Sequence, residues 1–280
     1  VNGEVSGAGN LVKSGSSSAV LAVGNSYTGT TSIAQGTLII RHGEALGSGD
    51  RTEATGTMLG GGQLQVEGPL TVSNERLTVS SGSLYARGEG TVVWETDITG
   101  AGTLYVDVGS GLRLDGSVAL GGSFYASGSG RLVVNGAANS VASFSRTYGV
   151  VELNGTVTAS VGGSLTEGAT LCGTGTLAIG SGTLAVGSSG SWSGSSGYIT
   201  PGGAPGVGIL HTGNIRFARG SFNVEMNGPA AGTGYDQLQE AGTVSLAGSL
   251  SLTVGKEFKH LVAQQFKILE HDVEDAISGK

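Results

Sequence analysis

Three tyrosines recur at 20-residue intervals in the middle of the chain, each at the end of a Gly-(Ser/Thr)-(Leu/Phe)-Tyr motif. They are Tyr85, Tyr105 and Tyr125. A tyrosine ring offers an apolar face to the C–H groups of a sugar and a hydroxyl group for hydrogen bonds. Tyrosines at a fixed interval therefore suit a repeating ligand such as a linear polysaccharide.

A second, polar row follows two residues after the tyrosine positions. Glu67, Arg87 and Asp107 occupy it, and Gln65 extends the tyrosine row by one repeat. Side chains two residues apart on a strand face the same way, so both rows are expected on one outer surface. Carboxylate, guanidinium and amide groups bind sugar hydroxyls through strong hydrogen bonds. The seven residues of the two rows form the predicted carbohydrate-binding site.

The same rows also have a purely structural interpretation. Stacked aromatic rings on neighbouring strands stabilise a fold by about 0.5–1.5 kcal/mol per pair. An exposed ladder of opposite charges contributes about 0–1 kcal/mol per contact. The sequence leaves the structural and the ligand-binding interpretations open with equal weight.

The elements that would position these rows come from a repeat that runs through much of the chain. A Gly-(Ser/Thr/Gln)-(Leu/Phe) tripeptide begins at Gly36, Gly62, Gly82, Gly102, Gly122, Gly163 and Gly182, and Phe144 fills the expected position between Gly122 and Gly163. Between the glycines, apolar and polar residues alternate over four to six positions, as in 131–136, and this pattern predicts short strands. About three strands per 20-residue repeat, each stacked on its equivalent, predict an all-β fold that is a single parallel β-helix.

The β-helix is expected over residues 1–255. Residues 256–280 are richer in charge and poorer in glycine, and we expect a cap or a connection to a further domain there. Residues 42–55 interrupt the repeat and predict an insertion at a corner of the coil. Residues 188–208 hold two of the four prolines and are expected to be irregular.

Composition excludes several classes of function. The chain has 280 residues, of which 54 are glycine, and a formal net charge of -7 with a pI near 5.1. This balance disfavours nucleic acid and anionic membrane surfaces as partners, because both require clustered Lys and Arg. No apolar run approaches the roughly 18 residues of a membrane helix. We expect an exported bacterial protein that is a monomer and needs no cofactor.

Single residues of chemical interest have simple structural explanations. Cys172 is the one cysteine and is expected to fill space in the core. Trp94 aligns with Leu114 and Val134 in the repeat and is expected to point inward, whereas Trp192 lies among glycines and serines and is a further exposed aromatic candidate. The histidines, His42, His211, His260 and His271, show no metal-binding spacing.

Catalysis is not expected. Glu67 and Asp107, two rungs apart, would be separated by about 9.6 Å, near the upper end of the roughly 6.5–9.5 Å of an inverting glycosidase. Arg87 lies between them in the repeat, and its positive charge would lower the pKa of both carboxyl groups, whereas a general acid needs a raised pKa.

Two stretches of the chain resemble a known class of protein. Residues 7–49 and 201–254 look like the passenger-associated repeats of bacterial autotransporters and related secreted β-helix proteins. This resemblance implies a right-handed parallel β-helix located outside the cell. Adhesins, accessory domains and inert stalks all carry such repeats, so the resemblance leaves the ligand open.

The tyrosine motif adds a second resemblance. The Gly-(Ser/Thr)-(Leu/Phe)-Tyr repeat is similar to carbohydrate-binding module family 89, a β-helical family that accompanies family-10 xylanases of gut bacteria. It implies xylan as the ligand and a covalently attached catalytic domain as partner. The sequence-based hypothesis is therefore a non-catalytic module that binds an extended β-1,4-linked polysaccharide. The alternative is a structural or adhesive β-helix segment of a secreted or autotransported protein.

Overall fold

The computed structural model describes residues 1–187, 196–203, 206–256, 258–259, 263–271 and 277–279. Its Cα atoms cluster into two compact units, Val1–Ala142 and Ser143–Lys280. The predicted irregular segment 188–208, and Trp192 with it, falls partly outside the described residues. Every strand pair with a described ladder is parallel, for example β10 with β13 and β20 with β23. The predicted all-β parallel β-helix is confirmed.

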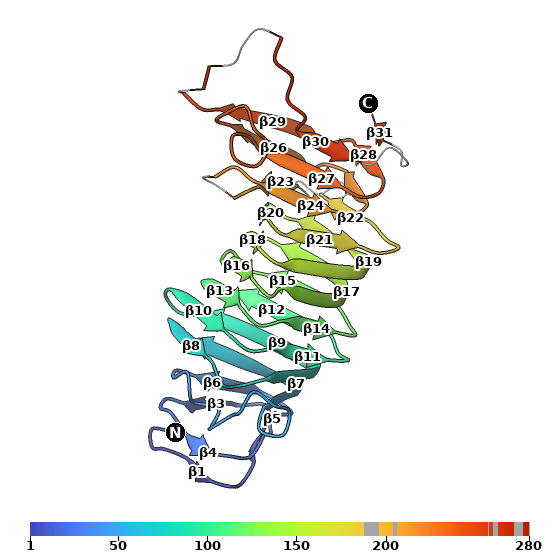
Figure 1. Ribbon diagram of the computed structural model, residues 1–280. Coiled ribbons are helices and arrows are strands. Elements are labelled where there is room, and N and C mark those ends of the chain that lie inside the picture. The colour runs from blue at the N-terminus through green and yellow to red at the C-terminus, as the bar shows by residue number, and fades with distance from the viewer. Residues whose placement is uncertain (188–195, 204–205, 257, 260–262, 272–276, 280) are drawn as a thin grey trace. The chain divides into compact units, whose positions relative to one another are not determined.

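Unit 1 contains three parallel sheets that the chain visits in turn (Figure 1). The first sheet holds β8 (Leu70–Val72), β10 (Thr91–Trp94), β13 (Gly111–Leu114) and β16 (Arg131–Val134). The second holds β2 (Leu11–Lys13), β5 (Thr31–Ile33), the first halves of β7 (Thr57–Glu67) and β9 (Leu77–Arg87), β11 (Ile98–Gly100) and β14 (Val118–Leu120). The third holds β3 (Ser18–Leu21), β6 (Thr37–Ile40), the second halves of β7 and β9, β12 (Leu104–Val108) and β15 (Phe124–Ser127). A short pair, β1 (Ser6–Gly7) and β4 (Ser26–Tyr27), lies apart from these sheets.

Unit 2 repeats this architecture. Its first sheet holds β18 (Val150–Leu153), β20 (Ala169–Gly173), β23 (Gly197–Pro201), β26 (Ser221–Met226) and β29 (Ser249–Val254). Its second holds the first half of β19 (Thr156–Thr166), β21 (Thr176–Ile179), β24 (Ile209–Thr212), β27 (Gln237–Glu240) and β30 (Leu269–His271). Its third holds the second half of β19, β22 (Leu184–Val186), β25 (Ile215–Phe217), β28 (Val244–Leu246) and β31 (Ile277–Gly279). The boundary between the units falls within β17 (Ala138–Thr147).

The core is the interior of the coils, as the alternating pattern predicts. Trp94, Leu114 and Val134 pair in register on β10, β13 and β16, and all three are buried, so the inward position of Trp94 is confirmed. Cys172 is also buried, as expected. Apolar side chains that stack on their equivalents one coil away exclude water from the narrow interior, which is the main stabilising contribution in such a fold.

Two predictions about the less regular segments have different outcomes. Residues 42–55 form the expected corner insertion, and Ala45 and Leu46 within it are buried. The irregularity expected for 188–208 is wrong for Gly197–Pro201, which forms β23 and pairs with β20 in register. β30 and β31 lie in the predicted cap and pair with β27 and β28. The domain boundary at residue 255 stays a prediction.

Candidate functional site

The predicted tyrosine row lies on the third sheet of unit 1, but only part of it is in register. Tyr105 and Tyr125 are direct partners on β12 and β15. Tyr85 on β9 pairs instead with Asp107, two residues beyond Tyr105. The expectation that all three tyrosines align is therefore wrong for Tyr85.

Tyr85 is displaced because successive coils have different numbers of residues at their corners. Ile98 pairs with Leu77 and Gly111 with Thr91, which are offsets of 21 and 20 residues. Leu104 pairs with Gly82, an offset of 22 residues. The strand between these two corners, β12, is therefore displaced along β9 by two residues relative to the 20-residue period. The corner that follows β9 contains Gly88 and Gly90, both at positive φ, and this left-handed backbone accommodates the extra residues.

The two aligned tyrosines stack on each other. Their ring centroids are 5.3 Å apart and their planes are inclined by 21°. A centroid distance of 5.3 Å between nearly parallel rings is within the range of a stacked aromatic pair. Tyr105 is 54% exposed and Tyr125 is 39% exposed. The stack therefore leaves much of both rings in contact with solvent.

Tyr85 is covered in a different way. The guanidinium carbon of Arg87 lies 4.9 Å from the Tyr85 ring centroid, in a cation–π contact. Arg87 Nη1 also donates a hydrogen bond of 2.7 Å to Asp107 Oδ1. This bond raises the pKa of Arg87 above its ordinary value, and it outweighs the opposing effect of partial burial. Arg87 therefore joins the Tyr85 ring to the Asp107 carboxylate across two strands.

Glu67 has a partner that the repeat did not predict. Arg41 Nε donates a hydrogen bond of 2.7 Å to Glu67 Oε2, and Gln65 bonds the other carboxylate oxygen. The bond from Arg41 holds the pKa of Glu67 below its usual value, and the bond from Gln65 acts in the same direction. The expectation that Arg87 neutralises both Glu67 and Asp107 is wrong for Glu67. Arg41 and Glu67 are as far apart in sequence as Gly36 and Gly62, so alignment of those two tripeptides across the insertion would have found the pair.

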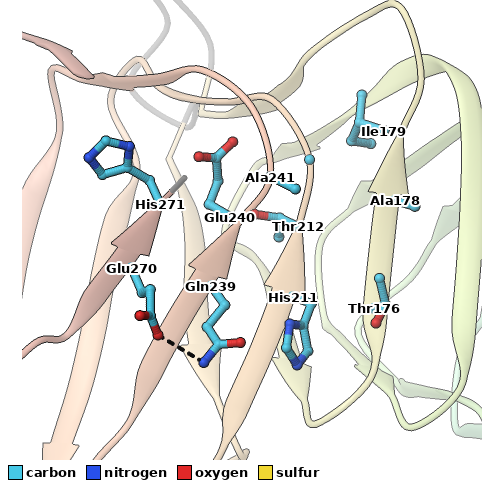
Figure 2. A pocket seen from close by; sticks show the side chains of 11 residues that line it. Thr176, Ala178, Ile179, His211, Thr212, Gln239, Glu240, Ala241, Glu270 and His271 are labelled. Carbon is cyan, nitrogen blue, oxygen red and sulfur yellow. Dashed lines mark hydrogen bonds between the residues drawn. The ribbon is translucent and has the colours of Figure 1, made fainter. Parts of the chain in front are cut away.

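A groove of about 580 Å³ in unit 2 was not predicted. His211, Gln239 and Glu270 line it from in-register positions on β24, β27 and β30 (Figure 2). Glu270 accepts hydrogen bonds from Gln239 and from Lys267. These three residues are separated by 28 and 31 residues in sequence, which is longer than the 20-residue period. A search for repeats of 28 to 31 residues would have been needed to align them.

On its inward-facing side, the same groove has buried polar atoms without hydrogen-bond partners among the described residues. Thr212 and Glu240 are buried, and His271 is their in-register partner. The Thr212 hydroxyl and His271 Nδ1 are buried and make no hydrogen bond in the described part of the chain. Within those residues no three His, Cys, Asp or Glu side chains gather as a metal site.

A third polar site lies at the corner insertion of unit 1. A pocket of about 520 Å³ is lined by residues that include Gly49 and Asn74. Behind Gly49 lies Glu75, which is fully buried. Its Oε1 accepts a hydrogen bond from Thr57, whereas Oε2 has no hydrogen-bond partner among the described residues. Burial raises the Glu75 pKa to about 8, against the lowering effect of Thr57, and the nearby Asp50 charge adds to the rise.

Comparison with known proteins identifies relatives for about half of the chain. Over 137 residues the chain is 32% identical to the adhesin BmaC autotransporter of Brucella suis, which is 49% of this chain and 3% of that protein. Over 133 residues it is 29% identical to the autotransporter lipoprotein NalP of Neisseria meningitidis, which is 46% of this chain and 12% of that protein. No family model matches the chain, and no solved structure matches it.

These relatives support one of the two resemblances noted in the sequence. Both are autotransporter proteins, in agreement with the passenger-type repeats. The extracellular or cell-surface location expected from the sequence agrees with this class of relatives. Neither relative supports the similarity to carbohydrate-binding module family 89 or a partnership with a xylanase. In the described residues there is no helix long and apolar enough to cross a membrane.

Proposed function

We propose that this chain is a structural or adhesive β-helix segment of the exported part of an autotransporter-type bacterial protein, without catalytic activity. The observation that carries the proposal is the match of nearly half of the chain to two autotransporter proteins. The parallel coils of each unit support it, because parallel coils can be added one after another to extend a segment without a new core.

The outer surface of unit 1 fits a structural role better than a sugar-binding role. Tyr105 stacks on Tyr125, and Arg87 forms an ion pair with Asp107, so each of these side chains has a partner on a neighbouring coil. Such contacts join one coil to the next, which is what a structural segment requires.

Surface labelling of intact cells tests the proposal. Antibodies against the purified chain should label unpermeabilised cells of the source bacterium, and external protease should remove the label. A cytoplasmic protein measured in the same samples should resist the protease. Label that is found only after permeabilisation would contradict the proposal.

Glycan binding is a second candidate, supported by the exposure of Tyr105 and Tyr125 on neighbouring strands, with Asp107 two residues after Tyr105. Affinity electrophoresis of the purified chain in gels with xylan, mixed-linkage glucan or pectin tests it. Retardation by xylan that is lost in a folded Tyr105→Ala variant, but kept in Tyr148→Ala, would favour a xylan-binding surface. Tyr148 is a matched control because it is also an exposed tyrosine and is not part of the predicted rows. Equal mobility with and without every glycan would exclude this candidate.

A further inference from the structure

The groove of unit 2 has a wall of polar side chains. Thr176, His211, Gln239 and Glu270 pair in register on β21, β24, β27 and β30, and Figure 2 shows them on these adjacent strands. All four are half-exposed, and the next residue on β21, β24 and β27 is buried, so the row faces outward. At about 4.8 Å per strand, the row is about 14 Å long.

The floor of the groove is made of small residues. Ala178, Gly213 and Ala241 line it two residues beyond the wall positions of β21, β24 and β27, and therefore on the same face. Gly213 packs closely on β21, because a methyl group there would lie 2.8 Å from Ile179 N. Residues this small leave space beside the wall, and the groove measures about 580 Å³. This volume is within the roughly 300–1,000 Å³ of small-molecule sites.

Hydrogen bonds within the protein hold the Gln239 amide in place. Its Nε2 atom donates to Gln237 Oε1 at 2.8 Å and to Glu270 Oε2 at 3.1 Å. Both N–H groups of the amide are used in this way, whereas the amide oxygen accepts no hydrogen bond from the described residues. The oxygen is therefore an oriented acceptor that is available to a ligand.

The neighbouring wall residues add further donors and acceptors. The His211 ring and the Thr176 hydroxyl make no hydrogen bond within the part of the chain that the structure describes. A neutral imidazole offers one donor and one acceptor, and a hydroxyl offers both. The charge of Glu270 is balanced by Lys267, whose Nζ donates a hydrogen bond of 2.9 Å to Oε1. The outward side of the groove thus combines several hydrogen-bonding groups with a balanced charge.

These groups match an uncharged ligand that is rich in hydroxyl groups. An anion is bound best by a free cation, and Lys267 is already paired with Glu270. A peptide added as a strand needs an unpaired strand edge, whereas β24 and β27 each pair with a strand on both sides. Sugar hydroxyls both donate and accept hydrogen bonds. The C–H groups of a sugar can contact the methyl groups of Ala178 and Ala241.

We propose that this groove binds a short neutral saccharide such as a disaccharide. Its hydroxyl groups bond to His211, Gln239 and Glu270, and one of its C–H faces lies on the alanine floor. The proposal gives the adhesive form of the proposed function a ligand and rests on that function. The site is distinct from the surface of Tyr105 and Tyr125, which belongs to unit 1.

Saturation-transfer NMR on the whole chain tests the proposal, with maltose, lactose, cellobiose and N-acetylglucosamine as probes at millimolar concentrations. At least one probe should receive magnetisation from the protein. His211→Ala and Gln239→Ala should each weaken the binding of that probe by about two- to tenfold, as expected for the loss of one hydrogen bond.

Filling the floor is a sharper test, because it removes no polar group. Ala241→Leu should abolish binding while circular dichroism shows a folded chain, and Ala178→Leu serves if that variant does not fold. Ala185→Leu is the matched control, since Ala185 is a half-exposed alanine on β22 that does not line the groove. This control and Tyr105→Ala should both bind as the wild-type chain does.

Two results would overturn the proposal. One is the absence of transfer to every probe from the folded wild-type chain. The other is binding that persists in a folded floor variant or is lost in Tyr105→Ala, because the sugar then lies outside the groove. Neither result changes the labelling of intact cells, which tests the location of the chain alone.

Discussion

Tyr105 and Tyr125 stack on neighbouring coils, with ring centroids 5.3 Å apart, whereas Tyr85 is displaced from them by two residues. This relationship turns a predicted platform of three rings into one stacked pair and one ring beneath an arginine. The pair contributes to the stability of the coils, and both rings remain partly exposed to solvent.

The tyrosine stack should be measurable as a coupling energy. A double-mutant cycle with Tyr105→Ala and Tyr125→Ala should give a coupling of about 0.5–1.5 kcal/mol in the free energy of unfolding, measured by urea denaturation. The same cycle with Tyr85→Ala and Tyr105→Ala should give a coupling close to zero, because these rings are not register partners. Equal couplings in the two cycles would show that the register in solution follows the 20-residue period.

The ion pair between Arg87 and Asp107 should contribute little. Both side chains are about one-third exposed, so water and salt screen their attraction. Asp107→Asn should lower the free energy of unfolding by about 1 kcal/mol or less at low salt, and by less still at high salt. Arg113→Gln, which removes the exposed pair with Asp115, is a matched comparison. A loss that stays large at high salt would contradict a screened surface pair.

Glu75 should make the stability of unit 1 depend on pH. Its folded-state pKa is about 8 against an ordinary value of 4.5. Between these values the folded chain holds a proton that the unfolded chain has released. The Glu75 contribution to stability is therefore complete below the lower value and is lost as the pH rises to the upper one. The slope has an upper limit of about 1.4 kcal/mol per pH unit.

Glu75→Gln tests this dependence, because the amide keeps the size of the side chain and an oxygen for Thr57 but does not ionise. Urea unfolding at several pH values should show that the wild-type chain loses stability relative to the variant between about pH 5 and 8. Two curves that run parallel over this range would mean that Glu75 titrates normally in the folded protein.

Glycines at the corners should differ sharply in their tolerance of a side chain. A methyl group on Gly130 would lie 1.7 Å from the Ser110 carbonyl oxygen of the coil below, whereas one on Gly3 would have no atom within 4 Å. Gly130→Ala should therefore destabilise unit 1 by more than about 2 kcal/mol, and Gly3→Ala should have little effect. Thermal unfolding followed by circular dichroism checks both variants, and similar midpoints would show that the coils are less closely spaced than described.

The sequence by itself determined the fold class, because that information is local. Alternation of apolar and polar residues defines the strands, glycines mark the corners, and a period near 20 places each strand on its equivalent. The inward position of Trp94 could be predicted for this reason. The same pattern located the corner insertion at residues 42–55.

Only the tertiary structure decided which side chains meet on the outer surface. The register of two strands depends on the number of residues in each corner. The length of the repeat does not reveal how its residues are divided between corners and strands. Tyr85 therefore pairs with Asp107 instead of Tyr105. Leu252 has the pattern of a core residue, and its exposure follows from its place at the edge of a sheet, where no strand of the described residues lies next to β29 and excludes water.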